Sequence, residues 1–137
     1  MKCLIFNIDQ GSIANYTVGE LFETEMENAH PSVHAKEGFS IYEKDGMVAG
    51  ITIFFKAGYL GHNNKVYQGR ISYNNDEVDL SSTSTPEDIV NVFGIPSEQW
   101  NDGVEKCMIF MTEGKEIEFI WSVDKVNALE YISVSKD

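Results

Sequence analysis

Three histidines are the residues with the most direct route to metal chemistry. His30 and His34 lie four residues apart, a spacing that places two imidazoles on one face of a helix, with His62 as a distant third ligand. Pro31 stands between the first two and breaks such a helix. We therefore expect solvated loop histidines and no metal site.

The serine and glutamate residues that could act in catalysis lack the neighbouring residues that such chemistry requires. The run Ser81-Ser82-Thr83-Ser84 has neither a G-x-S-x-G turn nor an accompanying base, so it is interpreted as a polar approach to a helix cap at Thr85. Glu116 and Glu118 alternate with apolar residues, which is typical of the solvated face of a strand. Neither G-x-x-x-x-G-K nor G-x-G-x-x-G occurs. The sequence predicts no catalytic residue and no cofactor.

Aromatic residues outside the expected core are candidates for binding a partner. Trp100 lies in a polar segment between Gln99 and Asn101, where a tryptophan either packs back or contacts another protein. Tyr59 stands in a connecting segment and leaves the same two alternatives open. Trp121 is predicted to belong to the core, because it shares a strand face with apolar neighbours.

Charge limits the kinds of partner. The chain has 22 Asp and Glu against 10 Lys and Arg, and its isoelectric point is about 4.5. Residues 1–68 carry a net charge of −3 and residues 69–137 carry −9. With Arg70 as the single arginine, nucleic acid and anionic membranes are disfavoured. The acidity serves either solubility or steering toward a basic protein. The acids chosen as partner-binding candidates near Trp100 are Asp76, Glu77, Asp79, Asp102 and Glu105.

Length and cysteine placement indicate a folded chain of one domain or two intimate lobes. The 137 residues are 42% hydrophobic. Cys3 and Cys107 lie in apolar runs, which favours buried free thiols over a disulfide. The apolar run after Lys2 is shorter than the core of a signal peptide, so we expect a cytoplasmic protein.

The turn signals predict hairpins, and the caps predict two helices. A helix should begin after Thr85, with Pro86 first and Asp88 completing a capping box, and end near Phe93 before Gly94. A second helix should begin at Thr17 with Glu20 three residues on, bury Leu21, and stop before Pro31. The expected strands are Lys2–Ile8, Ser12–Tyr16, Gly38–Glu43, Met47–Phe55, Tyr67–Tyr73, Val78–Ser82, Lys106–Thr112, Lys115–Val123 and Ala128–Val134.

A shift of 68 residues lays the first half of the chain over the second. Thr17 then falls on Thr85, and Gly46 falls on Gly114. The remaining matched pairs are Glu20 with Asp88, Leu21 with Ile89, Ile41 with Ile109, Ala49 with Ile117, and Ile51 with Phe119. We expect an α+β fold of tandem duplicated ββαββ units with antiparallel sheet and one short helix each. Residues 1–66 form the first lobe, ββαββ, and residues 67–137 form the second, which has one further strand, ββαβββ.

One segment supports a family resemblance. The succession Tyr67-x-Gly69-x-Ile71, Thr85-Pro86-Glu87-Asp88-Ile89 and Phe93-Gly94-x-Pro96 resembles the helix-plus-hairpins architecture of the beta-lactamase inhibitor proteins and the SmpA/BamE outer-membrane assembly lipoproteins. The resemblance covers residues 67–134 and, more weakly, 1–55. It implies a fold and protein binding, and no functional residue is carried over from it.

These observations predict a non-enzymatic protein-binding protein. Its most concrete form is a bacterial immunity or inhibitor protein that caps a basic toxin or enzyme. A structural or adaptor module that assembles through an exposed strand edge is the alternative.

Overall fold

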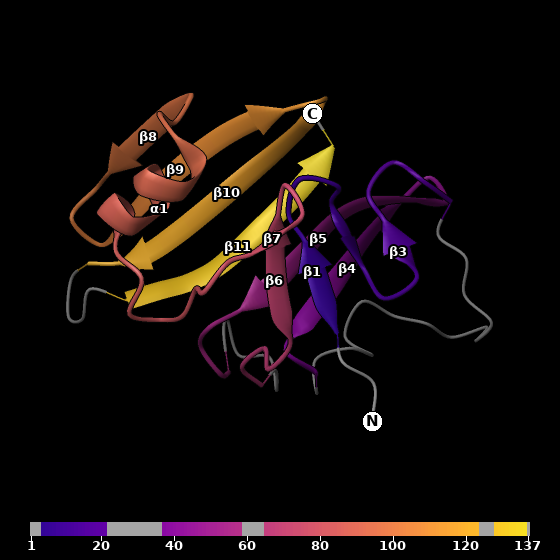
Figure 1. The fold of residues 1–137 in the computed structure, drawn as a ribbon, viewed down its shortest axis with the longest axis horizontal. Coiled ribbons are helices and arrows are strands. Elements are labelled where there is room, and N and C mark those ends of the chain that lie inside the picture. Colours follow the sequence, from indigo (N-terminus) through magenta and orange to yellow (C-terminus); the bar gives the residue numbers. More distant parts are fainter. Residues whose placement is uncertain (1–3, 22–36, 59–64, 124–127, 137) are drawn as a thin grey trace.

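The computed structural model describes residues 4–21, 37–58, 65–123 and 128–136. Within these ranges, strands and one helix form an α+β fold with two sheets (Figure 1). A five-stranded small sheet has the order β3-β2-β1-β6-β7, and a six-stranded large sheet has the order β4-β5-β11-β10-β9-β8. The elements are β1 (Ile5–Asn7), β2 (Ser12–Ile13), β3 (Tyr16–Thr17), β4 (Phe39–Lys44), β5 (Met47–Phe54), β6 (Arg70–Tyr73), β7 (Asp76–Glu77), α1 (Pro86–Phe93), β8 (Glu98–Asn101), β9 (Glu105–Thr112), β10 (Lys115–Ser122) and β11 (Ala128–Lys136).

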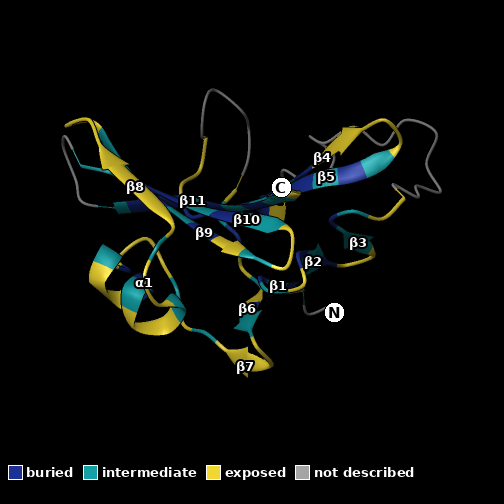
Figure 2. Cartoon of the chain, turned by 90° about the horizontal axis from the view of Figure 1, so that it is seen from above, coloured by how far each residue is buried: buried dark blue, intermediate teal, exposed yellow. Residues whose placement is uncertain are grey.

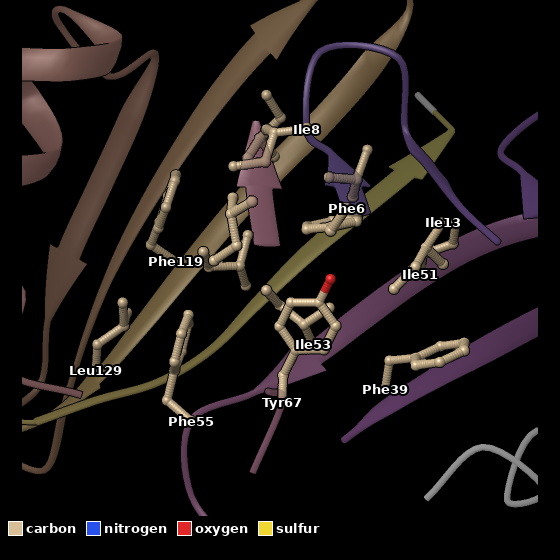
Figure 3. Close-up of a cluster of buried hydrophobic side chains, with 14 of the residues drawn as sticks. Phe6, Ile8, Ile13, Phe39, Ile51, Ile53, Phe55, Tyr67, Phe119 and Leu129 are labelled. Carbon is tan, nitrogen blue, oxygen red and sulfur yellow. The ribbon is translucent and has the colours of Figure 1, made fainter. Parts of the chain in front are cut away.

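The small sheet and α1 lie on the same side of the large sheet, and the core fills the space between these layers (Figures 1 and 2). Phe6 and Ile8 of the small-sheet segment and Ile89 of α1 are fully buried. Phe119 and Trp121 of β10 meet them from the large sheet, and Figure 3 shows part of this cluster. Phe93 of α1 packs its ring 5.1 Å from that of Phe119, so the helix is held to the sheet by aromatic contact.

Three hairpins are closed by two-residue turns in which both central residues have positive φ. Asp45 and Gly46 join β4 to β5 with φ of 56° and 79°, and Glu113 with Gly114 joins β9 to β10. Asn74 and Asn75 join β6 to β7 in the same way. This geometry matches the twist of antiparallel strands and favours Gly, Asn and Asp. The predicted hairpins at these positions are confirmed.

The helix α1 follows its caps as predicted. The Thr85 hydroxyl accepts a hydrogen bond from the Asp88 amide, and the Asp88 carboxylate accepts one from the Thr85 amide. The helix ends at Phe93 because Gly94 takes a positive φ of 89° and its amide closes the last turn on the Val90 carbonyl.

The prediction of a helix beginning at Thr17 is wrong for the part that the structure describes. Tyr16–Thr17 is strand β3, Gly19 takes a left-handed φ of 89°, and Leu21 is exposed rather than buried. The Gly19 amide donates to the Val48 carbonyl, and the Glu20 carbonyl accepts from the Val48 amide, both at 2.8 Å. Pairing with β5 replaces the capping box here. The remainder of the predicted helix lies outside the described residues.

The expectation of purely antiparallel sheet is also corrected, because β1 pairs with β6 in parallel. Each sheet contains strands from both predicted units: β1 lies beside β6, and β5 lies beside β11. Of the predicted repeat pairs, Gly46 and Gly114 occupy equivalent turns, whereas Thr17 and Thr85 do not occupy equivalent places.

Two further differences concern short strands. Strand β8 forms where the sequence predicted a loop around Trp100. The segment 78–82 was predicted as a strand, but the pairing with β6 is made by Asp76–Glu77. Among the described residues, no helix has the length and apolar character needed to cross a membrane.

Candidate functional site

The large sheet has two different faces. Its inner face carries Phe119 and Trp121 of β10 and packs against α1 and the small sheet. Side chains alternate along a strand, so Glu116, Glu118 and Ile120 lie on the opposite side, which we call the outer face.

An apolar row crosses the outer face from β8 to β5. Trp100 is opposite Cys107, Cys107 is opposite Ile120, Ile120 is opposite Tyr131, and Tyr131 is opposite Phe54. Cys107, Ile120 and Phe54 are buried, yet they do not belong to the main core cluster between the layers. The row ends at Trp100, whose side chain is 43% exposed.

Four glutamates of β8, β9 and β10 share the outer face with this row. Burial raises the pKa of the Cys107 thiol to about 12, and the negative charges of Glu118, Glu116, Glu98 and Glu105 act in the same direction. Strand register places all four on the outer face: Glu98 is opposite Ile109, which is opposite Glu118, while Glu116 lies two residues further along β10 and Glu105 begins β9. Such a thiol stays protonated at neutral pH and is not a nucleophile. Cys107 is a free cysteine, as predicted, and Cys3 lies outside the described residues.

The β8–β9 turn is built by its own polar side chains. The Asp102 carboxylate accepts hydrogen bonds from the amides of Val104 and Glu105 at 2.9 and 2.8 Å, and these bonds lower the pKa of Asp102. The Asn101 side chain accepts a hydrogen bond from the Gly103 amide. The turn holds Trp100 and Glu105 on neighbouring strands, with a fixed geometry, beside a permanent negative charge.

Exposed apolar side chains concentrate in the same part of the chain. Eight large hydrophobic side chains are exposed among the described residues, and five of them lie between residues 92 and 111. Ile95, at 90%, is the most exposed of all. The five side chains come from α1, the loop after it, β8, the β8–β9 turn and β9, and α1 packs on the inner face while Trp100 lies on the outer face, so they do not form one continuous patch. The five are Val92, Ile95, Trp100, Val104 and Met111.

The structure separates the predicted binding residues into two groups. Trp100, Asp102 and Glu105 come together at the β8–β9 turn. Asp76 and Glu77 form β7, the edge strand of the small sheet, and Asp79 follows it. The predicted clustering of these three acids around Trp100 is therefore not observed. Tyr59, His30, His34 and His62 lie outside the described residues.

The β7 group borders a shallow hollow of about 360 Å³. Arg70 Nε lies 3.4 Å from Glu77 Oε1, and both side chains are mostly exposed. This ion pair offsets one of the acids, so the β7 group is less negative than its composition suggests. The lining residues are Gly69, Arg70, Ile71, Glu77, Val78, Asp79 and Leu80.

Two structural interpretations of polar or aromatic residues are confirmed. Trp121 is 1% exposed and donates from Nε1 to the Ser84 carbonyl at 2.8 Å. The Ser84 hydroxyl accepts from the Ser81 amide, so this serine run shapes the approach to α1. Across the described ranges, no group of three or more His, Cys, Asp or Glu side chains is arranged to hold a metal ion.

The sequence reasoning missed Glu98 as part of this site and read Glu116 and Glu118 as solvated surface alone. The alternation of Glu116, Ile117, Glu118 and Phe119 placed both glutamates on one face. Nothing local indicated that β8 would bring Glu98 and Trp100 beside them, because that contact depends on pairing with β9.

No family model and no curated protein matches the chain. Among solved structures, it is similar to the crystal structure of a DUF4309 family protein (YjgB) from Bacillus subtilis subsp. subtilis str. 168, with a TM-score of 0.43 and 16% identity. The match covers 72% of this chain and 56% of that protein, so this chain spans little more than half of its length.

Proposed function

We propose that the chain is a non-enzymatic protein-binding protein that captures a basic partner at the β8–β9 end of the large sheet. The most concrete form of this function is a bacterial immunity or inhibitor protein that caps a basic toxin or enzyme. The observation that carries the proposal is the half-exposed Trp100 on the same face of the large sheet as Glu98, Glu105, Glu116 and Glu118.

The two kinds of residue have different roles in such a complex. Exposed carboxylates attract a basic protein over a distance and raise the association rate, an effect that salt screens. An aromatic side chain that becomes buried in the complex slows dissociation. Both are present on one rigid hairpin, whose turn is fixed by Asp102.

Binding kinetics test this proposal. The product of the neighbouring gene is the first partner to examine, because an immunity gene lies beside the gene of its toxin. We expect Trp100→Ala to increase the dissociation rate by about 10- to 30-fold. The double variant Glu98→Lys/Glu116→Lys should slow association and weaken its dependence on salt.

A matched control separates local from global charge. Asp76→Lys/Asp79→Lys makes the same change in net charge on the β7 side of the molecule. It should affect association much less than the change at Glu98 and Glu116. Equal effects of the two double variants would show that net charge alone steers the encounter, and unchanged rates in every variant would overturn the proposal.

A second candidate function is a structural or adaptor module in a larger assembly. The edge strand β8, with all four residues exposed, favours it. The tandem, inhibitor-like arrangement of the two halves stays a prediction: the equivalent turns at Gly46 and Gly114 support it, whereas Thr17 in β3 and Thr85 at the cap of α1 do not match.

A further inference from the structure

Strand β8 forms an edge of the large sheet within the part of the chain that the structure describes. Strand β8 is the last strand in the order of the large sheet, and among the described residues it pairs with β9 alone. Each of its four residues is exposed, and Figure 2 shows β8 at the margin of the molecule. Unpaired strand edges are a template for another strand.

The register determines which backbone groups face this edge. The Asp102 amide donates to the Glu105 carbonyl, and β8 and β9 continue in the same register through Trp100 and Cys107. In an antiparallel pair, hydrogen-bonded pairs alternate with non-bonded ones. Trp100 therefore bonds toward β9, and Gln99 and Asn101 direct their backbone N–H and C=O groups to the outside.

The pairing of β9 with β10 independently gives the same alternation of hydrogen-bonded residues. The Val123 amide donates to the Val104 carbonyl, and the register of β9 and β10 extends this to Lys106 with Trp121. The even-numbered residues of β9 thus bond to β10, and its odd-numbered residues, including Cys107, bond to β8. Gln99 and Asn101 are left with four outward backbone groups.

The side chains next to this edge determine which strand would fit. Trp100 and Glu98 lie on the outer face beside the edge, and Glu105 of β9 and Glu118 and Glu116 of β10 lie on the same face further from the edge. An added strand would place every second side chain on that face. Arginine suits these positions, because it stacks on an indole ring and pairs with carboxylates.

We propose that β8 accepts an extended basic segment of the partner as a seventh strand of the large sheet, with Arg or Lys at alternate positions over Trp100 and Glu98. The mode is strand addition, in which backbone bonds hold the segment and alternate side chains select it. This inference rests on the proposed function and names the part of the partner that docks. A second copy of this chain fits poorly, since each copy carries a net charge of −12 and would bring Glu98 against like charge.

The first experiment uses a capped octapeptide in which Arg and Thr alternate, with affinity measured by fluorescence anisotropy. Two modified versions carry N-methyl groups on every Thr amide or on every Arg amide, which leaves the charge unchanged. Antiparallel addition opposite Gln99 and Asn101 directs the Thr amides to β8, so Thr methylation should weaken binding about tenfold or more while Arg methylation does not. The reverse pattern would indicate parallel addition.

The second experiment changes the protein. Gln99→Pro removes one outward N–H, at a position where an edge strand tolerates proline. Gln99→Ala is the matched control, because it removes the same side chain and keeps the N–H. We expect the proline variant to lose binding of the octapeptide and the alanine variant to retain it. Thermal unfolding verifies that both variants fold, and the methylated peptides test the wild-type protein without any substitution.

The outcomes separate this inference from the proposed function. Equal, salt-dependent binding of all three peptides would overturn strand addition and leave capture by charge intact. Failure of every peptide, with the full-length basic partner still bound, would overturn strand addition as well. A dimer of this chain in sedimentation equilibrium that Gln99→Pro dissociates would assign the edge to a second copy and also overturn the inference.

Discussion

Trp100 and Trp121 show how the same residue type serves opposite faces of one sheet. Trp121 is buried on the inner face and satisfies the carbonyl of Ser84. Trp100 is 43% exposed on the outer face of β8. Local sequence predicted the burial of Trp121, which shares a strand face with Ile117 and Phe119, but left the exposure of Trp100 open.

The two tryptophans predict very different costs of substitution. Trp121→Phe leaves the buried Ser84 carbonyl without its donor and creates a small void, so the free energy of unfolding should fall by about 2–4 kcal/mol. Trp100→Phe should change it by less than about 0.5 kcal/mol. Urea unfolding measures both, and similar losses would contradict the assigned burial.

Asp102 predicts a pH effect confined to the β8–β9 turn. Hydrogen bonds from the Glu105 and Val104 amides lower the pKa of this carboxyl in the folded chain. Its contribution to the turn is therefore present above the usual Asp pKa and is lost as pH falls through the folded value. The amide resonances of Val104 and Glu105 should titrate at a pH below about 3.9. In Asp102→Asn this titration should be absent, and a midpoint above that value in the wild type would contradict the turn geometry.

At the scale of elements, the helix caps provide a direct comparison of two sites that look alike in sequence. Thr85→Ala removes the hydroxyl that accepts the Asp88 amide, and it should cost about 1 kcal/mol of stability. Thr17→Ala should cost clearly less, because Thr17 lies in β3 and not at a helix N-terminus. Equal losses in chemical denaturation would indicate that both threonines cap helices.

The elements that sequence predicted are those whose signals are local. The hairpin turns at Asp45, Asn74 and Glu113 depend on two residues each, and the limits of α1 are determined by its own capping residues. Strand β8 and the parallel pair of β1 and β6 depend on partners elsewhere in the chain, so no short window of sequence contains them. The segment after Thr17 shows this limit of local sequence signals most clearly. The backbone groups of Gly19 and Glu20, which a helix would have used, form hydrogen bonds with Val48 instead.

The residues of the candidate site also divide into those predicted from local sequence and those brought together by strand pairing. Trp100, Asp102 and Glu105 are close in sequence and were predicted together. Glu98, Glu116 and Glu118 share their face only through the pairing of three strands, and Asp76, Glu77 and Asp79 were grouped with Trp100 although Asp76 and Glu77 form a strand of the other sheet and Asp79 follows it. Proximity in sequence to a turn therefore identified the β8–β9 residues but not which other acids share their face.

For the whole molecule, the net charge of −12 predicts that salt stabilises the fold. Like charges repel within the folded chain, and ions screen this repulsion. We expect the melting temperature to rise by about 2–5 °C between 10 and 300 mM NaCl. The variant Glu98→Gln/Glu116→Gln relieves part of the crowding around Cys107 and should gain less from salt. Calorimetry at both concentrations measures this, and a melting temperature that falls with salt would contradict it.

The pairing of β5 with β11 also governs the order in which the chain can fold during synthesis. Ile53 lies opposite Ile132, so the β4–β5 hairpin joins the large sheet only through a strand made 79 residues later. Until the ribosome has released that strand, the early hairpin exposes the apolar edge and face that β11 will cover. Closing so long a loop is slow compared with forming a hairpin. A ribosome stalled before residue 128 would carry an incomplete sheet, and a chaperone that binds nascent apolar strands would find its target there rather than in the finished molecule.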